Sequence, residues 1–201
     1  MLPAGFELGF DELAVKTAEN VNQTAKALLA ASGHAGKNFA VDEDDHYLIV
    51  SSDDFCYTYY KLTGVFAKLV YKNQSLLDRP MEYNIWRAPT DNDRNNKLEW
   101  MKAQYDRIVT RAYEPKVHKT EKEVKIETTL SISAIYIQRI LDIQVTWNIQ
   151  ADGTVDIAMD VKRNPIFPML PRFGLRLFLP KEMKDVTYYG LGPVESYMDK
   201  R

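Results

Sequence analysis

The chain has 201 residues, of which 45% are apolar and 27% are charged, and its formal net charge is −2 at pH 7. This length and composition are typical of one ordinary globular domain with at most a short appendage, and the near-neutral charge excludes the basic surface expected of a nucleic-acid-binding protein. No apolar run approaches the roughly 20 residues that a membrane span requires. The single cysteine, Cys56, excludes an internal disulfide.

The first 38 residues have little regular pattern. Residues 17–31 are rich in Ala, Lys, Gln and Leu and could form a helix, but Gly33 and Gly36 follow, so a linker remains equally open. The first five residues, Met-Leu-Pro-Ala-Gly, do not have the basic and apolar regions of a signal peptide. Together with the low cysteine content, this favours a cytoplasmic protein.

The next part of the chain predicts short strands. Residues 47–50, 55–60 and 65–71 are rich in β-branched and aromatic side chains, and turn residues at 62–64 and 72–75 separate or end them. Cys56 lies in the second of these runs, and we expect it to be a small buried apolar residue.

A helix is predicted after these strands. Leu98, Met101, Tyr105 and Ile108 recur at spacings of three or four residues, which favours a helix over residues 98–113.

The later part of the chain predicts longer strands. Apolar and polar residues alternate over 124–132, 141–149 and 155–161, the period of a half-buried strand. Between the last two, Ala151-Asp152-Gly153 supplies a turn, because glycine takes a positive φ without steric cost. A final strand over 172–179 lies between two prolines. Strands at these spacings predict an all-β antiparallel sandwich.

The segment that follows Trp86 carries the candidate chemistry. Asp91, Asn92 and Asp93 offer oxygens to a hard cation, but an EF-hand spacing fails, with Asn96 where glycine is required and Lys102 where the bidentate glutamate belongs. A retaining glycosidase needs two carboxyl groups about 5–5.5 Å apart with different pKa values. Two aspartates in one loop do not supply that difference, so no catalytic pair is predicted.

Other candidates for chemistry have simpler explanations. The three histidines, His34, His46 and His118, do not cluster, which gives no support to a zinc site. Trp147 lies on an alternating strand and is expected in the core, whereas Trp86 is a candidate for a pocket or an interface. Arg172 and Arg176 fall on the strand face opposite Leu175 and Leu177 and are expected to pair with carboxylates of a neighbour.

Four sequence blocks resemble a known family. The most specific is Trp86-Arg87-Ala88-Pro89-Thr90-Asp91-Asn92-Asp93, and the others are residues 55–77, 170–176 and 189–201. Taken in their order along the chain, these four blocks resemble the C-terminal small-chain domain of glycoside hydrolase family 2 β-galactosidases. In the last block Ser196 stands where asparagine is usual, and Lys200 interrupts the usual Asp-Arg pair.

The resemblance implies an antiparallel supersandwich of the galactose-mutarotase type, incomplete at its C-terminus, with one short helix. Residues 1–38 would be the end of an immunoglobulin-like β-sandwich domain plus a linker, and residues 39–201 the N-terminal part of the supersandwich. A sandwich interrupted in this way is expected to present unpaired strand edges and exposed apolar surface, so the isolated chain is expected to self-associate.

The resemblance also implies a function. A β-galactosidase of this family hydrolyses terminal β-D-galactosides such as lactose with retention, through two glutamates on a barrel that this chain does not include, and with a divalent cation, magnesium. We therefore expect no catalytic residue and no cofactor in this chain itself. We expect it to shape the active-site wall and to pack against the barrel, with partners in the remaining domains or a large subunit of a homo-oligomeric enzyme. The rim candidates are Trp86, Arg87, Asp91, Asn92, Asp93 and Arg94.

Two alternatives stay open. The chain could be a stand-alone carbohydrate-binding β-sandwich that uses exposed aromatic side chains, or the separate small subunit of a two-chain β-galactosidase. Neither alternative, nor the preferred one, involves nucleic acid or a membrane.

Overall fold

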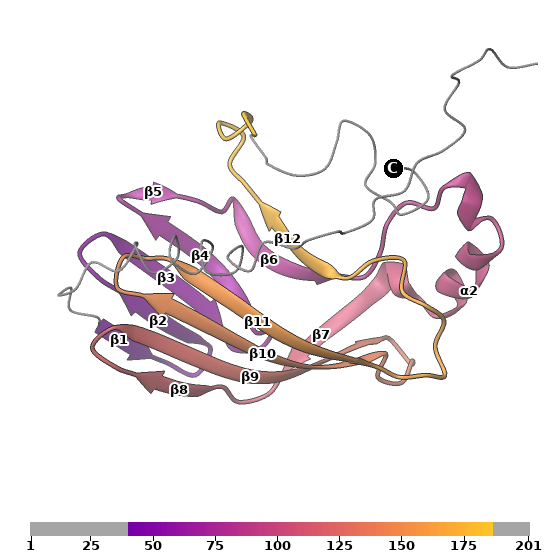
Figure 1. Ribbon diagram of the computed structural model, residues 1–201, viewed down its shortest axis with the longest axis horizontal. Helices are drawn as coiled ribbons and strands as arrows, with labels where there is room; N and C mark the ends of the chain where they lie inside the picture. Colours follow the sequence, from indigo (N-terminus) through magenta and orange to yellow (C-terminus); the bar gives the residue numbers. More distant parts are fainter. Residues whose placement is uncertain (1–39, 187–201) are drawn as a thin grey trace, which may run out of the picture. The chain divides into compact units, whose positions relative to one another are not determined.

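The computed structural model describes residues 40–186, all within one compact unit of the chain, His34–Arg201 (Figure 1). The strands are β1 Ala40–Glu43, β2 Tyr47–Ser51, β3 Phe55–Tyr60, β4 Val65–Tyr71, β5 Gln74–Ser75, β6 Arg79–Asn84, β7 Ile108–Ala112, β8 Lys116–Lys119, β9 Glu123–Ala134, β10 Leu141–Gln150, β11 Val155–Arg163 and β12 Gly174–Phe178. The helices are η1 Asp91–Asp93, α2 Asn96–Lys102 and η2 Tyr105–Arg107. None of the helices in the described part is long and apolar enough to cross a membrane.

The first sheet is an antiparallel meander in the order β1-β2-β3-β4-β5. Alternate residues of its central strands are buried, which places one face of the sheet on the core and the other toward solvent. The β4–β5 turn is tight because Lys72 and Asn73 both adopt positive φ, at 47° and 63°. Two consecutive residues of this kind match the right-handed twist of the strands that they join.

The second sheet has the order β11-β10-β9-β7, and β8 also pairs with β9. The 12-residue strand β9 is long enough to pair with β8 through its first half and with β7 through its second half. The β10–β11 hairpin runs from Leu141 opposite Arg163 to Ile149 opposite Val155. Gly153 in its turn has φ 89°, so the predicted glycine turn is confirmed.

The core lies between these two sheets. Phe66 of the first sheet meets Trp147 of the second edge to face, with ring centroids 5.0 Å apart. The Tyr59 hydroxyl and the Thr128 hydroxyl, also from opposite sheets, are hydrogen-bonded at 2.8 Å. Trp147 is only 2% exposed, as its alternating strand predicts.

Gly64, in the β3–β4 turn, lies at the centre of this packing. Its carbonyl oxygen accepts hydrogen bonds from Trp147 Nε1 at 3.3 Å and from the Tyr83 hydroxyl at 3.2 Å. Its φ is 71°, and a Cβ atom there would lie 3.2 Å from the Ala112 Cβ. A glycine is therefore required at this position both by backbone conformation and by space.

A third, two-stranded sheet pairs β12 with β6. Strand β6 leads into residues 85–95, and the chain then continues through η1, α2 and η2 into β7. In Figure 1, α2 lies at the end of the molecule where β7 begins, away from the β1–β5 hairpins. The third sheet thus sets where the Trp86–Arg94 segment starts.

The expected all-β antiparallel sandwich with one short helix is confirmed. The helix expected over 98–113, however, is too long. Its α-helical part ends at Lys102, Gln104 adopts a left-handed φ of 56°, and residues 108–112 form β7. The β-branched residues in 108–110 favour a strand, and pairing with β9 supplies its hydrogen bonds.

The expectation of a buried Cys56 is wrong. Cys56 is exposed, because in β3 it is Phe55, Tyr57 and Tyr59 that face the core, and the intervening positions point outward. The expectations for residues 1–39 and for the block 189–201 fall outside the described residues, so the predicted division of the chain at residues 38 and 39 stays a prediction.

Candidate functional site

The Trp86–Arg94 segment begins at a fixed point at the end of β6. Ile85 is fully buried in the core. The Asn84 side chain donates from Nδ2 to the Trp86 carbonyl oxygen at 2.8 Å and accepts from the Trp86 backbone N–H at 3.2 Å. These two hydrogen bonds close a turn through a side chain, a role that asparagine commonly has at loop starts. Trp86 is thereby held in one orientation.

Asp93 organises the rest of the segment. Its Oδ1 accepts from Arg87 Nη2 at 2.9 Å, and its Oδ2 accepts from the backbone N–H of Thr90 at 2.8 Å and from the Thr90 hydroxyl at 3.0 Å. Asp93 is only 6% exposed. Thr90 and Asp93 form a capping box at the start of η1, which satisfies backbone donors that a helix start leaves free.

These contacts keep Asp93 ionised. The hydrogen bond from the Thr90 backbone has the largest effect, and with the nearby Arg87 charge it holds the pKa of the Asp93 carboxyl below its usual 3.8. A general acid at neutral pH needs the opposite, a raised pKa. Asp93 therefore anchors the loop and is unsuited to donating a proton.

Two tryptophans and an arginine pack behind the segment. Trp86 meets Trp100 of α2 edge to face, with centroids 6.4 Å apart and planes at 86°. The Arg87 guanidinium lies 5.8 Å from the centroid of the Trp100 ring, a cation–π distance. Trp100 Nε1 in turn donates to the Met169 carbonyl oxygen at 2.9 Å, which ties α2 to the β11–β12 connection.

The three other predicted residues face solvent. Asp91, Asn92 and Arg94 are exposed, and their side chains make no hydrogen bond or ion pair with any other residue between 40 and 186. The structure therefore brings Trp86, Arg87 and Asp93 together into an internal framework. That framework presents Asp91, Asn92 and Arg94 outward, with their polar groups available for contacts to another molecule or domain.

Metal ligands do not gather in the described part of the chain: residues 40–186 contain no group of three or more His, Cys, Asp or Glu side chains that could hold an ion. Asp93 fits a loop-closing role better than a cation site, since both of its carboxylate oxygens already accept hydrogen bonds.

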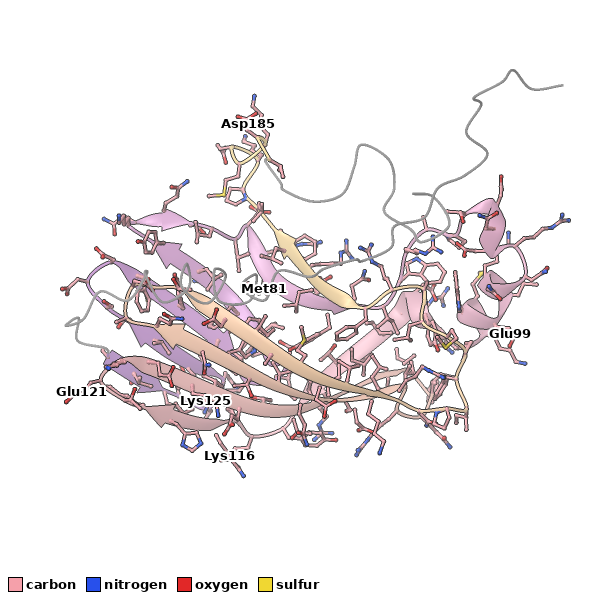
Figure 2. The ribbon with its side chains drawn as sticks, viewed as in Figure 1. Met81, Glu99, Lys116, Glu121, Lys125 and Asp185 are labelled. Atoms are coloured by element: carbon pink, nitrogen blue, oxygen red, sulfur yellow. The ribbon has the colours of Figure 1, made fainter. Side chains whose placement is uncertain are left out.

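A pocket of about 370 Å³ lies beside Trp86. The sequence did not indicate it. Its walls come from β6, β7, β12, η2 and the β3–β4 turn. Figure 2 shows Met81 of β6, one of the lining residues, in the middle of the molecule, with Glu99 marking α2 beyond it. Because these strands are far apart in the sequence, no local pattern predicts that their residues line one pocket.

Comparisons with known proteins agree with the sequence blocks. A family model described as the β-galactosidase small chain matches residues 51–201. The chain is 35% identical over 200 residues to a β-galactosidase of Actinobacillus pleuropneumoniae, which covers 100% of the chain and 19% of that relative. It is 33% identical over 196 residues to a β-galactosidase of Staphylococcus xylosus, a match that covers 97% of the chain and 19% of that relative. It is 32% identical over 160 residues to a β-galactosidase of Lactobacillus delbrueckii subsp. bulgaricus, a match that covers 79% of the chain and 16% of that relative.

The chain spans about a fifth of the length of these relatives, 19% of the first two. It corresponds to the small-chain portion of these longer relatives. From the matched residues and the all-β fold together, the chain belongs to the β-galactosidase small-chain family.

Proposed function

We propose that this chain is the non-catalytic C-terminal portion of a β-galactosidase that hydrolyses terminal β-D-galactosides, lactose among them, with retention. Family membership and relatives named β-galactosidase support this activity for the whole enzyme. The whole enzyme is proposed to be a cytoplasmic homo-oligomer that uses magnesium bound outside this chain. Its catalytic glutamates belong to the barrel.

The role proposed for this portion is to shape the wall of the active site and to pack against the barrel. The observation that carries this role is the framework of Arg87, Thr90 and Asp93, whose three hydrogen bonds to one carboxylate fix the loop. A loop held in one conformation loses little entropy when a substrate or a domain docks on it. Its outward residues, Asp91, Asn92 and Arg94, are the proposed rim contacts.

The structure offers no carboxylate pair in this loop for glycoside hydrolysis. Asp93 stays ionised and is bound on both oxygens, and Asp91 is exposed to solvent. A retaining mechanism needs a protonated acid next to an ionised nucleophile. The isolated chain should therefore not turn over substrate.

The test uses the full polypeptide whose reading frame includes this chain. It should hydrolyse a chromogenic β-galactoside, and the purified 201-residue chain should not. In the full polypeptide, Asp91→Ala, Asn92→Ala and Arg94→Ala should each lower kcat/KM about two- to tenfold, the effect of losing one net hydrogen bond. Lys116→Ala on β8, exposed and far from α2 in Figure 2, is the control and should leave kcat/KM unchanged.

Turnover by the isolated chain would contradict the absence of catalysis from this portion. Unchanged kinetics in all three rim variants would contradict the rim role while leaving the family assignment intact. A reading frame bounded by start and stop codons at this chain would instead favour a separate small subunit or a stand-alone binding module. Adding a large subunit would then distinguish those two, since only the small subunit would restore turnover.

A further inference from the structure

We infer that one end of the sandwich is a docking surface for another domain of the same polypeptide, the domain that holds the active site. The surface is built by three segments: α2, the β9–β10 turn at residues 135–140 and the β11–β12 connection at residues 164–173. Its exposed apolar side chains, called the end patch below, are Leu98, Met101, Ile135, Tyr136, Ile166 and Met169. The inference rests on the proposed function, in which this chain is one portion of a longer enzyme.

The end patch gathers most of the strongly exposed apolar side chains of the described fold. Among residues 40–186, seven large apolar side chains are more than 55% exposed, and six of them belong to the end patch. Their exposed fractions range from 56% for Met101 to 102% for Tyr136. Apolar residues scattered singly over a surface need no partner, whereas a group of them marks an interaction site.

Hydrogen bonds hold the three segments against one another. Trp100 Nε1 of α2 donates to the Met169 carbonyl oxygen at 2.9 Å. Asn164 donates from its backbone N–H to the Ile140 carbonyl oxygen at 2.9 Å and from Nδ2 to the Arg139 carbonyl oxygen at 3.1 Å. In Figure 1 the three segments accordingly lie at the same end of the molecule. The end patch is therefore formed before a partner arrives, which limits the entropy lost on docking.

Tyr136 has the most unusual conformation in the end patch. Its φ is 63°, in the left-handed region that a bulky residue adopts only at a cost in free energy. Its side chain is fully exposed, so the fold of this chain gains no burial in return. Tyrosine is one of the residues that contribute most to the centres of protein interfaces. Burial of the Tyr136 ring in a partner would offset the cost of its backbone conformation.

The charges around the end patch indicate the chemistry of the partner. Residues 91–107, 135–142 and 163–172 together contain seven Lys and Arg against five Asp and Glu, whereas the whole chain has a net charge of −2. An apolar centre with a charged rim is the usual arrangement of a protein interface. The positive excess favours a partner surface that is apolar at its centre and carries carboxylates at its rim.

Two observations favour a domain of the same polypeptide as this partner. The chain spans 19% of the length of its first two relatives, so most of a polypeptide of that length lies outside this portion. The end patch is also continuous with the proposed rim loop, because Arg94 is only two residues before the start of α2. A domain that contacts the rim loop therefore also reaches the end patch.

A photo-cross-linking experiment identifies the occupant in the full polypeptide whose reading frame includes this chain. Benzoylphenylalanine replaces Tyr136, and cross-linked peptides are identified by mass spectrometry after irradiation. We expect a cross-link to another domain, with the mass on a denaturing gel remaining that of one polypeptide. The control replaces Leu62, 55% exposed in the β3–β4 turn, and should not give that cross-link. A cross-link from position 136 to a second copy, or none at all, would overturn the inference.

Cleavage by chymotrypsin after Tyr136 measures docking independently. Cleavage requires the undocked state, so its rate follows the population of that state. Met169→Asp should raise the rate in the full polypeptide about tenfold, because docking would then bury an unpaired charge. The backbone carbonyl of Met169 that binds α2 is kept in this variant. Leu62→Asp places the same charge outside the end patch and should leave the rate unchanged, and equal rates in the two variants would contradict the inference.

Turnover of a chromogenic β-galactoside by the same preparations separates this inference from the proposed function. An active polypeptide that fails the cross-linking and cleavage tests would overturn the docking surface alone. A polypeptide that cross-links from position 136 to another domain but shows no turnover would support the docking surface and contradict the proposed activity.

Discussion

At the scale of single residues, Asp93 has the most consequential set of contacts in the candidate loop. Its carboxylate accepts three hydrogen bonds from Arg87 and Thr90, and these favour the ionised form. The folded pKa is held below the usual 3.8. For a lowered pKa, the stabilisation is complete above the unfolded value and is lost as the pH falls through the folded value.

We predict that Asp93→Asn lowers the thermal unfolding midpoint at pH 7 by roughly 2–4 °C, the shift expected when a chain of this size loses one modest interaction. The amide cannot accept from both partners as the carboxylate does, and its NH₂ group would face donors. The difference from wild type should begin to shrink below about pH 4, where the Asp93 carboxyl of the unfolded wild-type chain starts to protonate, and it should be lost as the pH falls through the lower folded pKa. Calorimetry between pH 7 and pH 3 measures this.

The control for this prediction is Asp91→Asn. Asp91 is two residues away in the same loop, but its side chain is exposed and has no partner between residues 40 and 186. Its midpoint should match wild type at every pH. An Asp93→Asn midpoint that stays parallel to wild type down to pH 3 would contradict the role given to the Asp93 charge.

A second residue pair tests how the two sheets are joined. The hydroxyls of Tyr59 and Thr128 bond to each other inside the core, at 0% and 4% exposure. Tyr59→Phe should lower the free energy of unfolding by about 1–3 kcal/mol, because it leaves the Thr128 hydroxyl buried without its partner. Adding Thr128→Val should cost less than the two single changes summed, with a coupling of about 0.5–3 kcal/mol. Urea unfolding of the four proteins measures the cycle, and strict additivity would show that this bond does not link the sheets.

At the scale of elements, the β10–β11 turn depends on one glycine. Gly153 has φ 89°, and a Cβ there would lie 3.0 Å from the Tyr57 hydroxyl oxygen and 3.2 Å from Phe55 Cδ1. Gly153→Ala should therefore destabilise the fold by about 1–3 kcal/mol, since strain and crowding add. Gly174→Ala is the matched control: its Cβ would meet no atom within 4 Å, so its effect should stay within about 0.5 kcal/mol. Equal midpoints for the two variants in chemical denaturation would contradict this account.

The same hairpin shows which elements a sequence can predict. Its two strands alternate with period 2 over eight or nine residues, and a glycine turn joins them, so all the information is local. Strand β7 could not be predicted in this way. Its hydrogen bonds go to the far half of β9, from Ile108 opposite Ala134 to Ala112 opposite Leu130, and only tertiary structure supplies that partner. The apolar spacing that predicted a helix misled because Leu98 and Met101 are 63% and 56% exposed.

In the candidate site, too, the sequence predicted some features and not others. The Trp86–Asp93 block indicated the family and the loop. The ion pair between Arg87 and Asp93 was not predicted, since it depends on how six residues of loop fold back. The pocket beside Trp86 was also missed, because Glu82 and Arg176 lie 94 residues apart in sequence and meet only through the β6–β12 pairing.

At the scale of the whole molecule, the side chains of β11 at the edge of the second sheet are less buried than those of β10 at its centre. Trp147, Val145 and Ile143 of β10 are buried, but their partners Ile157, Met159 and Val161 on β11 are only partly covered. Ile157 is 37% exposed. Within residues 40–186, β11 pairs with β10 alone, which leaves a nine-residue edge next to apolar side chains. Such an edge readily pairs with another strand.

We therefore predict that the isolated chain self-associates through β11. Light scattering should give an apparent mass that rises above 23.2 kDa with concentration. Ile157→Lys should reduce the association, because an inward-pointing charge at an edge strand opposes strand addition. Ile135→Lys makes the same change at a site that is 62% exposed but lies in the β9–β10 turn, so it should leave association unchanged. If both variants reduce association equally, or neither does, non-specific hydrophobic contacts rather than the β11 edge drive the association. An apparent mass that stays at that of one chain at every concentration would show that the β11 edge does not pair with a second chain.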